Sequence, residues 1–140
     1  MFHSKGFTFI EMVFIMFIVS IFMILFIPNM IKTIEKQQTA QFFEVFSSDI
    51  LYIQNQSLRT NDRYRIILNE GHYTIIKDTQ FVQKREYPKH LKLLTNTNLR
   101  ISFTKSGTIT NPMTIKFEDR YHKYQVVFPF GKGRHYIEET

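Results

Sequence analysis

The sequence predicts an α+β fold in which one long N-terminal helix is laid across an antiparallel sheet. Three observations carry this prediction. Residues 7–27 are apolar except for Thr8, Glu11 and Ser20, and a helix of that length covers roughly 32 Å, enough to cross a bilayer. Apolar residues then recur at steps of three and four as far as residue 53, which indicates an amphipathic helix. After residue 62 apolar and polar residues alternate, as in strands with one buried face.

The chain beyond its apolar segment has the length of one domain. We divide residues 7–140 into a transmembrane and assembly helix at residues 7–28, an amphipathic helix at 29–57 and a globular antiparallel β domain at 58–140. Four large apolar residues at helical spacing form the predicted core face of the amphipathic helix: Phe42, Phe46, Ile50 and Ile53. A turn signal at residues 59–62 ends this helix.

Alternation and turn residues predict about six antiparallel strands after the helix. They cover residues 64–69, 72–77, 81–86, 99–104, 113–118 and 124–128, with a short edge strand at 91–93. Asn69-Glu70-Gly71 predicts a hairpin in which Gly71 takes the left-handed conformation. A further hairpin turn is expected between Phe128 and Tyr136.

Glu11 is the exceptional residue of the apolar segment. An ionised carboxylate costs roughly 2.5 to 3.5 kcal/mol at the bilayer centre and less near an end. Two interpretations follow. Glu11 lies close enough to the helix start for its charge to reach water at the interface, or it meets a cation inside a protein assembly.

Gly6 lies before the apolar run rather than after it, unlike the cleavage site of a secretory signal. Cleavage between Gly6 and Phe7 would remove only a six-residue leader, residues 1–6, and would leave the whole apolar helix on the mature chain. The new terminal amine would lie four residues from Glu11.

The motif Gly-Phe-Thr-x-x-Glu, formed by Gly6, Phe7, Thr8 and Glu11 ahead of an apolar helix, resembles the class III signal of type IV pilins and pseudopilins. The resemblance implies cleavage between Gly6 and Phe7 by a prepilin peptidase and N-methylation of Phe7. It also implies that Glu11 is the assembly charge, which pairs with the terminal amine of a neighbouring subunit. Phe9 stands where the family more often has leucine. Pro28 matches a family proline at which the helix bends or locally melts.

The C-terminal part of the chain is similar to ComGD, a family of minor pilins of the competence pilus in Gram-positive bacteria. Four segments carry this similarity: residues 101–109, 114–117, 124–128 and 131–134. The phenylalanine-to-glycine turn is also shared with minor pseudopilins of type II secretion, which remain the alternative. The resemblance implies a type IV pilin-like fold and a role in DNA uptake and transformation.

The same resemblance implies partners and location. The expected partners are the prepilin peptidase, the major pilin, other minor pilins and the membrane, with DNA as a possible further partner. The charges beside the apolar helix leave its orientation open because Lys32 and Lys36 follow it while Lys5 precedes it. The resemblance implies a cytoplasmic N-terminus in a single-pass precursor, followed by exposure at the cell surface in a pilus.

The net charge of +6 lies entirely beyond the apolar helix, because Lys5 and Glu11 cancel. Such a balance favours an acidic partner such as nucleic acid, anionic lipid or a wall polymer. Six cations near turns and aromatic residues are candidate DNA contacts: Lys84, Arg85, Arg120, Lys123, Lys132 and Arg134. The alternative is a solvated positive surface that keeps the domain soluble and protects sheet edges.

No enzyme chemistry is indicated. The chain has no cysteine, and its five histidines show no paired ligand spacing. The segment Gly131-Lys132-Gly133-Arg134 lacks the spacing and the following helix of a phosphate-binding loop, so a hairpin turn explains it better. We therefore expect no catalytic residue, no metal site and no cofactor.

Overall fold

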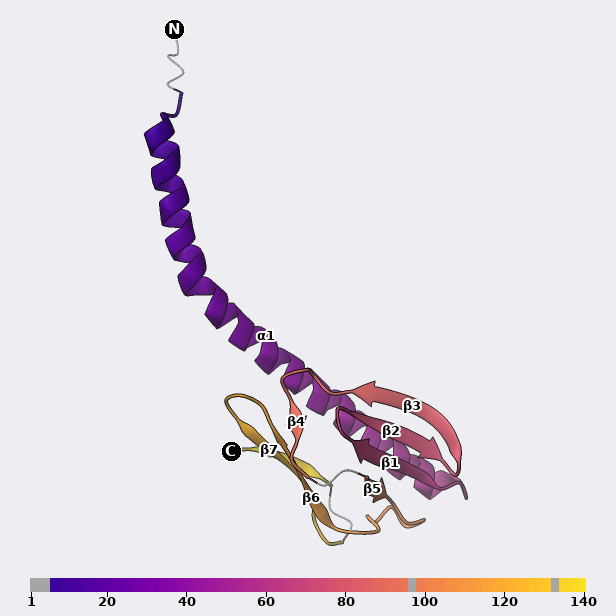
Figure 1. The fold of residues 1–140 in the computed structure, drawn as a ribbon. Coiled ribbons are helices and arrows are strands. Elements are labelled where there is room, and N and C mark those ends of the chain that lie inside the picture. The colour runs from indigo at the N-terminus through magenta and orange to yellow at the C-terminus, as the bar shows by residue number, and fades with distance from the viewer. Residues whose placement is uncertain (1–5, 96–97, 132–133) are drawn as a thin grey trace. The chain divides into compact units, whose positions relative to one another are not determined.

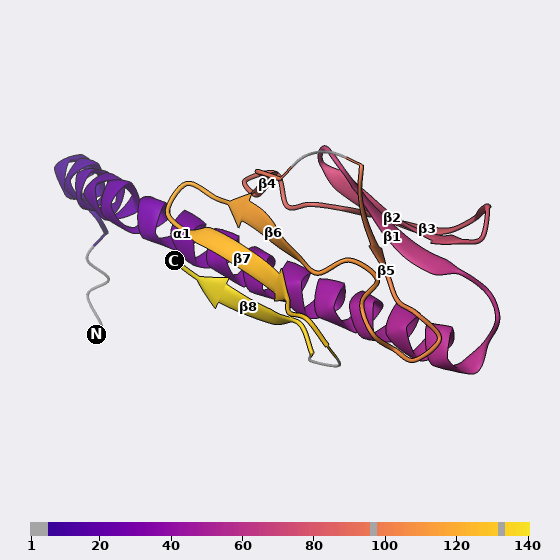
Figure 2. The same cartoon turned by 90° about the horizontal axis from the view of Figure 1, so that it is seen from below.

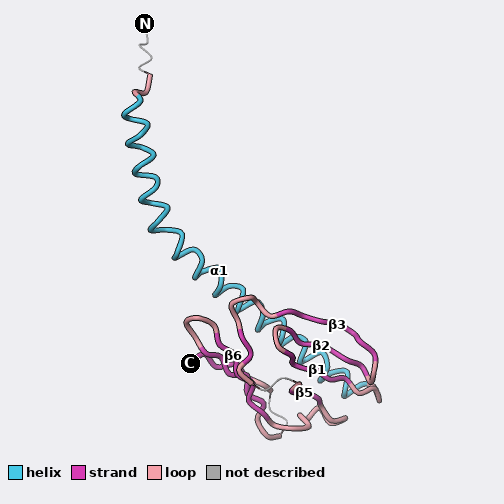
Figure 3. The backbone as a smooth tube through the Cα atoms, viewed as in Figure 1, coloured by secondary structure: helices cyan, strands magenta, loops and turns pink. Residues whose placement is uncertain are grey.

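The computed structural model describes residues 6–95, 98–131 and 134–140. The chain separates into two compact units, Met1–Gln37 and Gln38–Thr140. The long helix α1 (Phe9–Arg59) contributes residues to both units. The described residues after α1 form strands and connecting loops (Figure 3).

Helix α1 passes through Pro28 without a break in helical structure, so of the two alternatives expected there, a bend or local melting, melting does not occur. Its last turn is closed by Thr60, whose N–H and hydroxyl both donate to the carbonyl oxygen of Gln56, at 2.9 and 3.0 Å. The predicted helix end at residues 59–62 is confirmed, and the turn residues there explain it.

Among the described residues, eight strands follow the helix and form two antiparallel sheets of four strands each, which Figures 1 and 2 show beside α1. Sheet A has the order β3 (Gln80–Glu86), β2 (His72–Lys77), β1 (Tyr64–Asn69), β5 (Leu99–Ser102). Sheet B has the order β4 (Lys92–Leu93), β6 (Met113–Glu118), β7 (Lys123–Phe128), β8 (Tyr136–Glu139). The antiparallel α+β layout is as predicted, but the prediction of a single sheet is wrong.

Strand β8 was not predicted. Its residues Tyr136-Ile137-Glu138-Glu139 end in two adjacent carboxylates and show no clear alternation, so the two-residue period is absent. Pairing with β7 specifies the strand instead, with Val126 opposite Ile137. The predicted hairpin after Phe128 is the connection between β7 and β8.

An aromatic cluster joins the helix to both sheets. Phe42 packs edge-on against Phe117 of sheet B, at 5.7 Å between ring centroids, and Phe46 packs against Tyr73 of sheet A at 5.0 Å. The four helix residues predicted to face the core are all buried. Fully buried aliphatic residues from both sheets complete this core: Ile66, Leu68, Ile75, Ile101, Ile115 and Val126.

Two glycines satisfy turn requirements that other residues meet poorly. Gly71 has φ +78°, as predicted for the hairpin between β1 and β2. Gly107 has φ +72°, and a Cβ there would lie 3.0 Å from the Leu58 side chain. Glycine is therefore favoured at this position by its backbone conformation, and a Cβ there would also press on the exposed Leu58 side chain of helix α1.

Candidate functional site

The start of helix α1 is closed by a reciprocal pair of hydrogen bonds between Thr8 and Glu11. The Glu11 N–H donates to Thr8 Oγ1 at 3.3 Å, and the Thr8 N–H donates to Glu11 Oε2 at 3.5 Å. This is the capping box of a helix N-terminus, in which side chains satisfy backbone N–H groups that have no intrahelical partner. The cap was not predicted, although the Thr-x-x-Glu spacing is a sequence signal for it.

The Gly6–Phe7 bond lies immediately outside this capped helix. Both residues are outside regular secondary structure. The Phe7 side chain is 70% exposed, and a Cβ at Gly6 would meet no atom within 4 Å. Residues 1–5 of the expected leader lie outside the described residues. In the described part of the segment, the bond is sterically open.

Helix α1 contains a candidate membrane span. It is the one helix among the described residues that is long and apolar enough to cross a bilayer, and none of its most apolar window is buried within the protein. The Ser20 hydroxyl donates to the Met16 carbonyl oxygen at 2.8 Å, so this polar group is satisfied within the helix. Such an exposed apolar surface requires a lipid or protein environment.

The candidate DNA contacts are distributed over several parts of the second unit. Lys84 and Arg85 lie on β3, Arg120 in the β6–β7 turn and Lys123 at the start of β7. Arg134 lies just before β8. Because β7 and β8 are antiparallel, Lys123 and Arg134 lie at opposite ends of this strand pair. Lys132 lies outside the described residues.

Arg85 is engaged inside the protein. Its Nε donates to Asp49 Oδ2 at 2.7 Å, and the same oxygen accepts the Tyr73 hydroxyl at 2.6 Å. Asp49 and Tyr73 are both buried, and burial, followed by the hydrogen bond to Asp49, raises the pKa of Tyr73. Arg85 therefore serves first to neutralise a buried carboxylate, which leaves it less available to an external anion.

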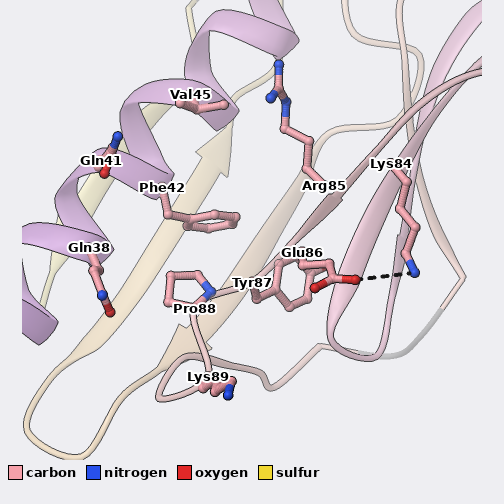
Figure 4. Close-up of a pocket in the computed structure, with 10 residues that line it drawn as sticks. All are labelled: Gln38, Gln41, Phe42, Val45, Lys84, Arg85, Glu86, Tyr87, Pro88 and Lys89. Carbon is pink, nitrogen blue, oxygen red and sulfur yellow. Dashed lines mark ion pairs between the residues drawn. The ribbon is translucent and has the colours of Figure 1, made fainter.

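A groove of about 600 Å³ lies between α1 and the end of β3 (Figure 4). One wall is a helix face and the other is a continuous run of residues after Gln83. The lining residues are Gln38, Gln41, Phe42, Val45, Lys84, Arg85, Glu86, Tyr87, Pro88 and Lys89. The groove thus combines apolar side chains with two amides, three cations and the carboxylate of Glu86.

A smaller pocket of about 260 Å³ brings Arg120 together with Lys89 and Lys92. His90, Glu118 and Asp119 also line it. The two carboxylates reduce the positive potential of this pocket for a polyanion. The structure therefore joins Arg120 to cations from another part of the chain, without making a uniformly basic surface.

The Asp119 carboxylate is used within its own turn. Its Oδ1 accepts the N–H groups of Tyr121 and His122, both at 2.7 Å, and its Oδ2 accepts the Tyr124 hydroxyl at 3.1 Å. Burial alone would raise the pKa of Asp119, but these hydrogen bonds outweigh it and lower the pKa. Asp119 therefore has a structural role at the β6–β7 turn.

Within residues 6–95, 98–131 and 134–140, no group of three or more His, Asp or Glu side chains is arranged to hold a metal ion. His90 Nε2 lies 2.8 Å from Thr39 Oγ1, and His135 Nε2 lies 3.0 Å from Ser47 Oγ. His90, between β3 and β4, and His135, just before β8, are therefore each hydrogen-bonded to helix α1.

No protein-family model, curated protein or solved structure matches the chain.

Proposed function

We propose that this chain is a minor pilin of a competence type IV pilus. A prepilin peptidase would hydrolyse the amide bond between Gly6 and Phe7, and the mature subunit would assemble through its apolar helix. The observation that carries the proposal is an exposed, non-helical Gly6–Phe7 bond directly before the capped start of an unburied apolar helix. The α+β unit that follows supports a pilin-like layout.

The geometry of the cleavage segment favours proteolysis. A peptidase must bind its scissile bond outside a helix, and the Thr8–Glu11 capping box keeps helical structure from extending back over Gly6 and Phe7. Glycine before the bond presents no side chain to the enzyme. Hydrolysis would leave a carboxylate on Gly6 and an amine on Phe7, which the family resemblance predicts to be methylated.

Glu11 would then have two successive roles. In the free chain its carboxylate caps the helix by accepting the Thr8 N–H. Among packed apolar helices, an unpaired carboxylate is strongly unfavourable, so pairing with the Phe7 amine of a neighbouring subunit would set the axial register. A secretion pseudopilin would use the same chemistry with a different cargo.

The first experiment is the intact mass and N-terminal sequence of the protein from cells with and without a functional prepilin peptidase. We expect a start at methylated Phe7 only where the peptidase is active. A start at Met1 in both strains would overturn the proposal.

Three variants separate capping from assembly. Glu11→Ala removes both the capping acceptor and the assembly charge, whereas Thr8→Ala removes the threonine cap at a cost of about 1 kcal/mol and leaves the charge. Glu35→Ala removes a carboxylate from the same helix away from its first turn. We expect loss of pilus incorporation only for Glu11→Ala. Equal losses for Glu11→Ala and Thr8→Ala would assign Glu11 to capping alone.

A second candidate function, direct DNA contact, is favoured by the pocket that joins Arg120 to Lys89 and Lys92. Binding through these cations should weaken steeply with salt because counterions are released from DNA. Reversal of Lys89 and Arg120 to Glu should reduce retention of labelled DNA by the full-length protein. The absence of salt-sensitive binding at low ionic strength would exclude this role.

A further inference from the structure

Strand β3 presents an open edge. It is the outermost strand of sheet A, and every residue in it except Arg85 is exposed. Phe81 has 67% of its surface exposed beside the exposed Val82. In an antiparallel ladder, every second residue of an edge strand points its N–H and C=O away from the sheet, which provides a template for another strand. Only a peptide backbone can pair with such an edge in register.

The groove continues from this edge. Its helix wall consists of residues 38, 41, 42 and 45, the spacing of one helix face, and its other wall is the run from Lys84 to Lys89 (Figure 4). Phe42, Val45 and Pro88 give apolar contact, whereas the side-chain amides of Gln38 and Gln41 can both donate and accept hydrogen bonds.

The cations at the rim define the charge of the occupant. Among the residues that the structure describes, the ion-pair partner of Lys84 is the exposed Glu86, at 3.7 Å, a contact that contributes little and is readily exchanged. Within the described part of the chain, Lys89 forms no ion pair. The groove therefore suits an extended segment that carries an aromatic ring with a polar tip and nearby carboxylates.

Strand β8 of the same chain has this chemistry. It is the outermost strand of sheet B, so its outer edge is also open. Tyr136 is 47% exposed, and Glu138 and Glu139 are exposed beside it. Glu139 Oε1 lies 3.4 Å from His122 Nε2, a partly exposed contact that contributes little and is readily exchanged. A tyrosine ring buries a large apolar area while its hydroxyl finds a polar partner, which makes tyrosine a frequent anchor at interfaces.

We propose that β8 of one copy adds to the open edge of β3 in a second copy. Tyr136 and Glu138 share one face of β8 and enter the groove beside Lys89, whereas Glu139 points to the opposite face, towards Lys84. Arg85 takes no part because Asp49 already holds its guanidinium.

The two edges belong to different sheets, so the contact is heterologous and repeats into an open row of subunits unless its rotation closes a ring. That such a row would form within a filament rests on the proposed function.

Zero-length cross-linking tests the contact without any substitution. A carbodiimide joins a carboxylate to an amine only where the two are in contact. Equal amounts of unlabelled and ¹⁵N-labelled full-length protein are mixed in detergent, cross-linked and digested for mass spectrometry. We expect peptides that join Lys84 or Lys89 to Glu138 or Glu139 with mixed isotope labels. Other intermolecular cross-links without these would overturn the proposal.

Charge exchange supplies the second test. We expect Lys84→Glu with Lys89→Glu, or Glu138→Lys with Glu139→Lys, to lower cross-linked dimer about tenfold. Mixing the two double variants should restore it, because each then offers the complementary edge. Lys116→Glu and Glu70→Lys, which change exposed charges on β6 and in the β1–β2 turn, are the matched controls. Failure of the mixture to recover would overturn the pairing.

Nucleic acid is the competing occupant. A labelled oligothymidylate that binds the wild-type protein, fails to bind the Lys84/Lys89 double variant and competes with the cross-link would assign the groove to nucleic acid and overturn the strand pairing. Peptidase-dependent cleavage at Phe7 is measured on the same variants. Normal cleavage with no edge contact would reject this inference alone and leave the proposed function intact.

Discussion

Replacement of Asp49 by alanine should destabilise the second unit strongly, although Asp49 is a charged residue. Its carboxylate lies on the buried face of α1 and accepts hydrogen bonds from Tyr73 and Arg85, at 2.6 and 2.7 Å. Tyr73 is fully buried, whereas the Arg85 side chain is 36% exposed. Asp49→Ala therefore leaves one partner without access to water and the other able to turn towards it.

The two partners contribute unequally to the expected loss. A hydrogen bond to a charged group is worth about 1.5 to 3 kcal/mol, and an unpaired buried hydroxyl costs about 1 to 3 kcal/mol. Solvent reduces the contribution of the partly exposed Arg85 to that of a surface pair, about 0 to 1 kcal/mol. We expect the free energy of unfolding to fall by about 2 to 4 kcal/mol. For a unit of this size, each kcal/mol lowers Tm by about 4 to 8 °C.

Thermal unfolding of the full-length protein in detergent, followed by tyrosine near-UV circular dichroism, measures this loss. Asp62→Ala is the matched control because Asp62 pairs with Lys77 at 2.8 Å on the surface, and its loss should cost under about 1 kcal/mol. In a double-mutant cycle, Asp49→Ala and Tyr73→Phe should couple by about 1 kcal/mol or more. Equal losses for Asp49→Ala and Asp62→Ala, or additivity in the cycle, would refute the reasoning.

Three further predictions test other parts of the second unit. Gly107→Ala should destabilise more than Gly71→Ala, whose strain costs about 1 to 2 kcal/mol, because only at Gly107 would the new Cβ also press on Leu58; equal losses in urea unfolding would contradict this. Tyr87→Phe should leave stability unchanged or raise it by about 1 kcal/mol, because no described residue bonds the buried Tyr87 hydroxyl; a clear loss would show that the hydroxyl is satisfied. Burial lowers the pKa of His135 in the folded state, so the folded state resists protonation of this imidazole. The stability that neutral His135 contributes is therefore fully present above its unfolded pKa of about 6.5 and is lost as the pH falls through its folded pKa. His135→Gln should flatten the fall in unfolding free energy between pH 7.5 and 5.5, and an unchanged slope would reject this assignment.

Much of the secondary structure is determined by local sequence patterns. The Phe42, Phe46, Ile50 and Ile53 stripe specifies which face of α1 is buried, because an α-helix repeats every 3.6 residues. Alternation in residues 64–69 likewise specifies the buried face of β1. These patterns depend on neighbours a few residues apart, so a single chain suffices to recognise them.

The candidate sites divide along the same line. The Thr8–Glu11 pair spans four residues, and its Thr-x-x-Glu spacing is a local sequence signal for the helix cap that the structure contains. Cleavage between Gly6 and Phe7 is implied by the family resemblance and stays a prediction. The basic residues could not be sorted in this way. The sequence predicts Lys84 and Arg85 alike as candidate DNA contacts. In the fold, Lys84 lines the groove and pairs with the exposed Glu86, whereas Arg85 neutralises the buried Asp49.

The division of the strands between two sheets was decided by tertiary structure. Strand β5 pairs with β1 and β6 pairs with β4 and β7, and nothing in the alternation of these strands distinguishes one partner from another. Likewise, β8 has no periodic signal and exists through its ladder with β7. A local pattern indicates only that one face of an element is buried. Which distant residues cover that face depends on how the loops close and the core packs. Tyr73 and Arg85, for example, cover Asp49 from 24 and 36 positions away.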